Sequence, residues 1–122
     1  MKDNVIVEKS FSFSVRIVNL CGELCRDRKE YVLSKQLLKS GTSIGANINE
    51  AQAAQSRSDF KSKMSIAAKE ARETMYWLDL LSATGYIDKN RPDHGALFNE
   101  IDSIVRILTS IVKTTQENDC EQ

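Results

Sequence analysis

Residues 40 to 81 read SGTSIGANINEAQAAQSRSDFKSKMSIAAKEARETMYWLDLL. Apolar residues recur at spacings of three and four on both sides of a short polar segment, which is the period of an amphipathic helix. Gly41 and Gly45 lie inside the first helical pattern, where a glycine costs about 1 kcal/mol relative to alanine. We therefore expect two helices joined by a polar turn, with the glycines marking the close approach of a neighbouring helix.

The composition is typical of one soluble globular domain. The chain has 122 residues, of which 41% are hydrophobic and 28% charged, and its one proline and five glycines favour helices over a turn-rich β fold. No apolar run approaches the roughly 20 residues that a membrane-spanning helix needs. The start, MKDNVIVEKSF, does not resemble a secretory signal. We expect a cytoplasmic protein with a single domain over residues 1–122, a core at about 7–115 and a polar C-terminal tail.

Four segments have helical periodicity and are separated by short connections. This arrangement favours an all-α, antiparallel up-down-up-down four-helix bundle. The expected helices run from about Val7 to Arg28, from Tyr31 to Gln55 and from Asp59 to Thr84. A loop over Tyr86–His94 precedes the fourth helix, which carries Leu97 to Val112, and we expect the tail from Thr114 to fray.

The connections carry residues that begin or end helices. Ser56 is a candidate N-cap with Asp59 three residues later, as in a capping box. Gly85 is suited to end a helix, and Pro92 is suited to begin one.

The first and third expected helices each carry two apolar stripes, although a bundle core needs only one stripe per helix. In the first helix, Phe11, Val15 and Val18 form one stripe and a second lies nearly opposite. A surplus stripe would be a large exposed patch on a monomer, so we predict burial against other copies of the chain. The alternative is a thick bundle core that absorbs part of both stripes. The predicted oligomer interface consists of Phe13, Ile17, Leu20, Leu24, Ile66, Trp77 and Leu80.

No combination of residues points to catalysis. The sequence contains no phosphate-binding loop, dinucleotide fingerprint or zinc-ligand spacing. Ser58 and Lys61 match an S-x-x-K pattern, but the serine is better explained as a helix cap. His94 is the only histidine, and we expect it to be solvated in a loop. We therefore predict a non-enzymatic protein without a cofactor, a metal or a small-molecule substrate.

The three cysteines have a structural interpretation. Cys21 and Cys25 lie one helical turn apart, and Cys120 lies in the polar tail. A metal site would need further ligands close by, so we expect core or flanking thiols in a reducing compartment.

Charge is unevenly distributed in a chain whose net charge is zero. Between Arg16 and Arg72, eleven Lys and Arg residues face six Asp and Glu residues. Repeated around a ring of subunits, these cations would form a basic collar that contacts phosphates of RNA or DNA. The alternative is an ordinary solvated surface, since Tyr76 is the only aromatic residue on that side. The candidate nucleic-acid-binding residues are Lys35, Lys39, Arg57, Lys61, Lys69 and Arg72.

Several segments together carry a family resemblance. They are SKQLLKSGTSIGANINEA (34–51), SRSDFKSKMSIAAKEARET (56–74), and YWLDLL followed by GYI within 76–87. The chain resembles the 23S rRNA intervening-sequence protein family over roughly residues 9 to 112. The resemblance implies an antiparallel four-helix bundle that assembles as a homopentamer, and it supplies no catalytic residues.

A related group is formed by the accessory proteins of diversity-generating retroelements. Those proteins form a basic pentameric barrel that binds nucleic acid and a reverse transcriptase, and this chain departs from them in having no net positive charge. We therefore expect a non-enzymatic, oligomeric scaffold or adaptor. The alternative is an accessory protein that binds RNA or DNA, with a reverse transcriptase as its partner.

Overall fold

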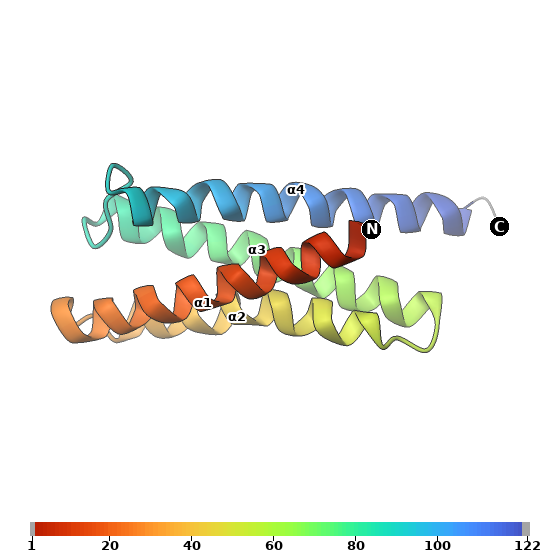
Figure 1. Cartoon of the computed structure of the whole chain (residues 1–122), viewed down its shortest axis with the longest axis horizontal. Helices are drawn as coiled ribbons and strands as arrows, with labels where there is room; N and C mark the ends of the chain where they lie inside the picture. The colour runs from red at the N-terminus through yellow and green to blue at the C-terminus, as the bar shows by residue number, and fades with distance from the viewer. Residues whose placement is uncertain (1, 121–122) are drawn as a thin grey trace.

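Four long helices joined by short connections make up the structure, a computed structural model that describes the backbone of residues 2–120 and the side chains of residues 5–116. Successive helices run in opposite directions (Figure 1). The all-α four-helix bundle is confirmed, and the described residues contain no strand. None of the described helices is both long and apolar enough to cross a membrane. The helices are α1 (Lys2–Arg28), α2 (Val32–Gln52), α3 (Arg57–Ala83) and α4 (Pro92–Cys120).

The helix boundaries differ from the predicted ones mainly at the two ends of the chain. Helix α1 begins at Lys2 rather than near Val7, and α4 continues to Cys120 through the tail that was expected to fray. The added segments contain no glycine or proline, so nothing in them interrupts a helix. Helix α2 is shorter than predicted and ends at Gln52.

The predicted capping residues occupy the predicted places. The Ser56 hydroxyl accepts a hydrogen bond from the Asp59 backbone N–H at 3.0 Å, and α3 begins at the next residue. Gly85 follows α3 with a φ of 82°, a conformation that glycine adopts without strain. Pro92 is the first residue of α4.

The two glycines of α2 bring α1 close, as predicted. A Cβ atom added to Gly41 would lie 2.9 Å from Cγ2 of Ile17, nearer than such atoms come in folded proteins. A Cβ atom added to Gly45 would lie 3.3 Å from the Ser14 hydroxyl oxygen. The absence of a side chain at Gly41 therefore makes room for an α1 core residue.

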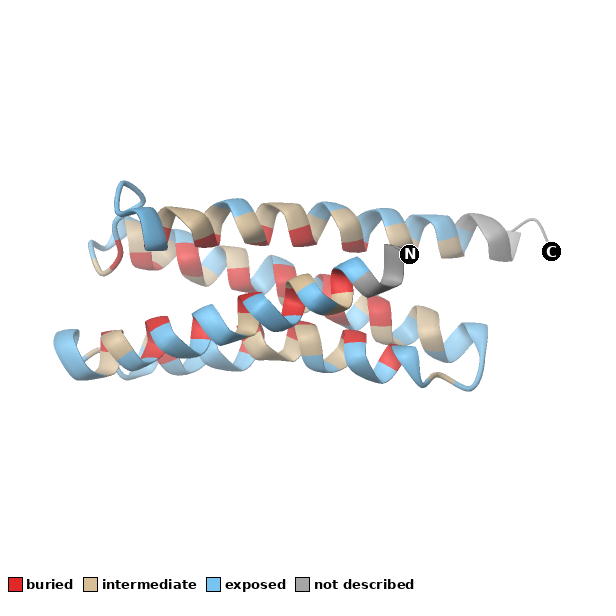
Figure 2. Ribbon diagram, in the orientation of Figure 1, coloured by how far each residue is buried: buried red, intermediate tan, exposed pale blue. Residues whose placement is uncertain are grey.

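The prediction for the first-helix part of the oligomer interface was wrong. Phe13, Ile17, Leu20 and Leu24 are at most 5% exposed and belong to the bundle core of the single chain. The buried stripe of α1 also includes Ile6 and Ser10, so it is longer than the opposite stripe. Its residue Ile17 fits into the space left by Gly41 of α2, and this explains why this stripe faces the core. Figure 2 shows the buried residues on the sides of the helices that face one another.

The opposite stripe of α1 is the one left on the surface. Phe11 is 71% exposed, and Val15 and Val18 are also exposed. We call these three residues the outer stripe. A surplus apolar stripe therefore exists on α1, as expected, but on the other face of the helix.

The second stripe of α3 is partly absorbed by the core. Ile66 is 40% exposed, whereas Trp77 and Leu80 are half-buried, and Trp77 packs against the core. Their place in an oligomer interface stays a prediction. Between α2 and α3, the Thr74 hydroxyl donates a buried hydrogen bond to the Ser40 hydroxyl at 3.0 Å.

Candidate functional site

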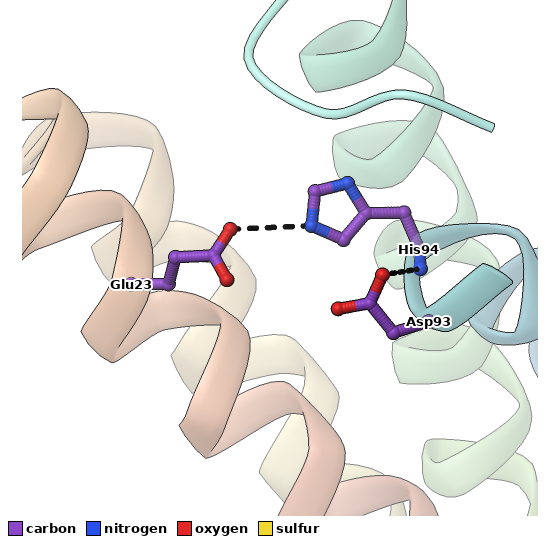
Figure 3. A group of neighbouring side chains, drawn as sticks. All are labelled: Glu23, Asp93 and His94. Carbon is purple, nitrogen blue, oxygen red and sulfur yellow. Dashed lines mark hydrogen bonds and ion pairs between the residues drawn. The ribbon is translucent and has the colours of Figure 1, made fainter. Parts of the chain in front are cut away.

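His94 is buried, and the expectation of a solvated loop histidine was wrong. Because α4 begins at Pro92, His94 lies in the first helical turn, and it is only 4% exposed. Its Nδ1 accepts a hydrogen bond from the Asp88 backbone N–H at 3.1 Å. The neutral ring therefore carries its proton on Nε2, which lies 3.3 Å from Oε2 of Glu23 on α1 (Figure 3).

Arg91 joins the carboxylates beside this histidine. Its guanidinium donates to both oxygens of Glu23, at 2.8 and 3.1 Å, and to both oxygens of Asp93, at 2.7 and 2.8 Å. The hydrogen bonds from Arg91 lower the pKa of the Asp93 carboxyl below its usual value. The hydrogen bonds to Glu23 and Asp93 raise the pKa of Arg91 further. Residues from α1, the α3–α4 connection and α4 are thus held in one network.

The same residues have the composition of a cation site but not its hydrogen bonding. One ligand atom from each of Glu23, Asp93 and His94 lies within 4.8 Å of the others. A metal-bound histidine donates its second ring N–H, whereas Nδ1 of His94 accepts a hydrogen bond and leaves the proton on Nε2. Arg91 also occupies both carboxylates. The network fits an ion-paired contact between α1 and α4 better than a metal site, and neither ring nitrogen is free to act as a base.

A groove of about 370 Å³ lies beside the network, between α1 and α4. The charged groups lining it are paired with groups of opposite sign: Arg16 lies 3.1 Å from Glu100, and Arg91 binds the two acids. The groove therefore presents no uncompensated charge that would select an ionic ligand. Its lining consists of Arg16, Asn19, Leu20, Glu23, Asp93, His94 and Leu97.

The cysteines at the end of α1 lie in the core or beside it, as expected. Cys21 is buried and donates to the Ser34 carbonyl at 3.3 Å, and Cys25 donates to the Glu30 carbonyl at 3.6 Å. Burial, and secondarily Cys25, raise the pKa of the Cys21 thiol to about 12, so it stays protonated and unreactive at neutral pH. The side chain of Cys120 lies outside the described residues.

The six basic candidates do not form one collar on the single chain. Lys69 and Arg72 line a groove between α3 and α4, together with Lys113. Lys39 interacts electrostatically with Glu70. Burial and, secondarily, the charge of Glu73 raise the pKa of the Glu70 carboxyl, and the charge of Lys39 offsets part of this rise. Lys35 is exposed on α2, and Arg57 and Lys61 lie in the first two turns of α3.

The model of the 23S rRNA-intervening sequence protein family matches residues 2–110. The chain belongs to this family. It is similar to a crystal structure, at 1.70 Å resolution, of a protein with unknown function from the S23 ribosomal protein family of Bacteroides thetaiotaomicron VPI-5482. The two chains share 55% sequence identity and a TM-score of 0.87, over 93% of this chain and 99% of the other. No curated protein matches the chain.

The chain has a second groove next to its outer stripe. The groove measures about 380 Å³, lies between α1 and α2, and is lined mostly by small side chains beside Phe11. Its lining consists of Val7, Ser10, Phe11, Ser14, Thr42, Gly45, Ala46 and Asn49. The exposed Phe11 therefore forms one side of a groove whose other lining residues are mostly small.

Two features of the family member were missed from the sequence. The His94 network joins residues about 70 positions apart, and no local pattern connects Glu23 with Arg91. Lys113 lies in the acid-rich half of the chain, yet it lines the same groove as Lys69 and Arg72. Lys113 lies one helical turn after Thr109 on α4, and both residues line this groove.

Proposed function

We propose that this protein is a non-enzymatic scaffold that works as an assembly of several copies. The supporting observation is the outer stripe of α1, in which Phe11 is 71% exposed next to the exposed Val15 and Val18. Fully burying a phenylalanine side chain stabilises a protein by about 1.5–3 kcal/mol. A second copy of the chain placed over the outer stripe would gain this contribution for Phe11 and further contributions for Val15 and Val18.

The surface beside Phe11 is suited to receive another helix. Ser14, Gly45 and Ala46 are small and line the groove beside Phe11. Helix α3 carries a further exposed apolar residue, Ile66, and α1 and α3 are not neighbours in the bundle. Two unlike faces on different sides of a subunit pair head to tail, and such contacts close into rings. The homopentamer implied by the family resemblance is one such ring.

The network around His94 supports the non-enzymatic part of the proposal. Both ring nitrogens of His94 are engaged, and both carboxylates beside it are bound by Arg91. The two free thiols, Cys21 and Cys25, are compatible with a reducing compartment, and we place the protein in the cytoplasm.

Light scattering coupled to size-exclusion chromatography tests the assembly. The wild-type mass should lie near five times the 13.7 kDa of one chain. Phe11→Glu should reduce the mass towards that of one chain and leave the helical circular dichroism unchanged, because Phe11 is exposed in the single bundle. Val32→Glu is the matched control, since Val32 is also 71% exposed but lies outside the outer stripe. A wild-type monomer at micromolar concentration would contradict the proposal.

Ile66→Glu tests the second face of the ring. Ile66 is 40% exposed, so the charge should break the assembly without unfolding the bundle. Trp77→Glu should also dissociate it, but the half-buried Trp77 packs against the core, so this variant loses stability as well. If Ile66→Glu keeps the wild-type mass while Phe11→Glu does not, the contact is between two outer stripes and not head to tail.

A further inference from the structure

Among residues 5–116, whose side chains the structure describes, the charged groups that line the groove between α3 and α4 are all positive. The groove measures about 280 Å³, and these groups belong to Lys69, Arg72 and Lys113. Ser65, Thr109 and Gln116 add hydroxyl and amide groups, and no carboxylate of the same residues lines the groove. The grooves along α1 and α4 differ, because acids and bases line them together.

The three cations are available to a ligand. Within residues 5–116, neither Lys69, Arg72 nor Lys113 forms an ion pair or a side-chain hydrogen bond with another residue. The guanidinium of nearby Arg106 is different, because it pairs with Asp102 within α4. Unpaired cations that converge on one groove attract a multiply charged anion.

Glu70 and Glu73, the two acids of α3 that lie between Lys69 and Tyr76, interact with residues outside the groove. Glu70 interacts with Lys39 on α2, and Glu73 accepts a hydrogen bond from the Trp77 indole N–H at 3.4 Å. Lys69 and Arg72 of α3 thus lie along α4, whereas Glu70 and Glu73 do not line the groove. A chain with zero net charge thus has a local cationic surface.

An exposed aromatic ring extends the same side of α3. Tyr76 lies one helical turn beyond Arg72 and two turns beyond Lys69, and it is 59% exposed. Its ring meets Trp77 edge to face with centroids 5.1 Å apart, so the free face of the tyrosine stays accessible. Single-stranded nucleic acids stack bases on such rings, whereas a duplex keeps its bases inside.

We propose that the groove between α3 and α4 binds single-stranded nucleic acid. Lys69, Arg72 and Lys113 contact consecutive phosphates, and Tyr76 stacks on a base at the end of the groove. The site lies on α3 and α4, so it leaves the outer stripe of α1 free for assembly. A ring of subunits would repeat the groove and multiply its affinity.

Fluorescence anisotropy with labelled oligonucleotides tests the proposal. The probes are oligouridine RNA and oligothymidine DNA of about 12 nucleotides, within the site sizes of single-strand binders. For three phosphate contacts, the logarithm of affinity should fall with the logarithm of salt concentration with a slope of about −2, a loss of roughly 20-fold between 50 and 200 mM. Comparison of the two probes shows whether the sugar contributes. Absence of binding at 50 mM salt would overturn the proposal.

Charge reversal locates the site. Lys69→Glu, Arg72→Glu and Lys113→Glu combined should weaken binding at least about tenfold and remove the salt slope. The matched control combines Arg26→Glu, Lys29→Glu and Lys35→Glu, which changes the net charge equally but lies outside the groove. An equal loss of affinity in both triple variants would mean that binding depends on the overall charge and not on the groove, and it would contradict the proposal.

Tyr76 variants separate stacking from charge. Tyr76→Ala should weaken binding roughly 5- to 150-fold, and Tyr76→Phe should retain it, because stacking needs only the ring. Binding of inorganic polyphosphate should be unaffected by Tyr76→Ala, since that polymer has no bases. Light scattering on each variant confirms the wild-type mass. A Tyr76→Ala protein that dissociates would assign the ring to a subunit contact and overturn the stacking role.

Discussion

Helix α1 contacts its two neighbours in opposite ways. Against α2 it packs closely, with Ile17 set into the space left by Gly41. Against α4 it packs less extensively and relies on charged pairs, Arg16 with Glu100 and Glu23 with Arg91. The contact with α2 depends on shape and burial, whereas the contact with α4 depends on charge and hence on pH and salt. We expect the α1–α4 contact to open first when the bundle is destabilised.

The largest predicted effect concerns the two phenylalanines of α1. Phe13→Ala should lower the free energy of unfolding by about 3–5 kcal/mol, because it leaves a cavity in the core. Phe11→Ala should change the stability of the single bundle by less than about 0.5 kcal/mol. Urea denaturation followed by circular dichroism, at two protein concentrations to detect losses of assembly, provides the measurement. Similar losses of unfolding free energy in Phe13→Ala and Phe11→Ala would contradict the assignment of one stripe to the core and the other to the surface.

A double-mutant cycle tests the close approach of α1 and α2. Gly41→Ala should destabilise the bundle by about 1–3 kcal/mol, because its methyl group would overlap Ile17. In an Ile17→Ala background that overlap disappears, so Gly41→Ala should become stabilising by up to about 1 kcal/mol through helix propensity. Chemical denaturation of the four proteins gives the coupling energy. Additive effects would show that the two positions do not constrain each other.

A smaller effect is expected at the α1–α4 contact. Glu23→Gln weakens the pairing with Arg91 and should lower the stability only slightly, since Arg91 is exposed to solvent and water screens the pair. Hydrogen exchange should increase in residues 85–91 and at the C-terminal end of α1, and the difference should shrink at high salt. Glu50→Gln is the control, because Glu50 is more exposed than Glu23 and its ion pair with Lys63 lies between α2 and α3. Faster exchange across all four helices would mean that this contact is not a separate unit.

The smallest predicted effect is a pH dependence at Asp93. Arg91 lowers the pKa of the folded-state carboxyl, so the stabilisation is complete above the usual aspartate range, near 4, and is lost as pH falls through the lowered value. Asp93→Asn should therefore be less stable than wild type at neutral pH, and the two should converge in acid. Thermal denaturation from neutral to acidic pH measures the difference. If the difference in stability between wild type and Asp93→Asn grew as the pH falls, the predicted stabilisation by the ionised Asp93 carboxylate would be contradicted.

Local residues determined most of the fold. Ser56, Gly85 and Pro92 end or begin helices where predicted, because capping depends on residues only a few positions away. The glycines of α2 were also interpreted correctly, since a glycine inside a periodic helix needs a packing reason. The family resemblance and the four-helix bundle are confirmed together.

The choice between the two stripes of α1 was not local. Both stripes have the same spacing of three and four residues, so periodicity alone does not rank them. The burial of Phe13 and Ile17 depends on the residues that α2 presents, Gly41 among them. The His94 network was missed for a related reason, because Glu23 and Arg91 meet only after α1 and α4 are in place.

The close contact at Gly41 also determines what the protein displays outside. If α1 slid along α2 by one turn, about 5.4 Å, either Phe13 or a residue near Leu20 would take the place of Ile17 over the glycine. A different side chain would then have to fill the same narrow space, and every residue of the outer stripe would change its height along the bundle. One missing side chain in the interior thus sets the height along the bundle at which Phe11 and Val18 are exposed.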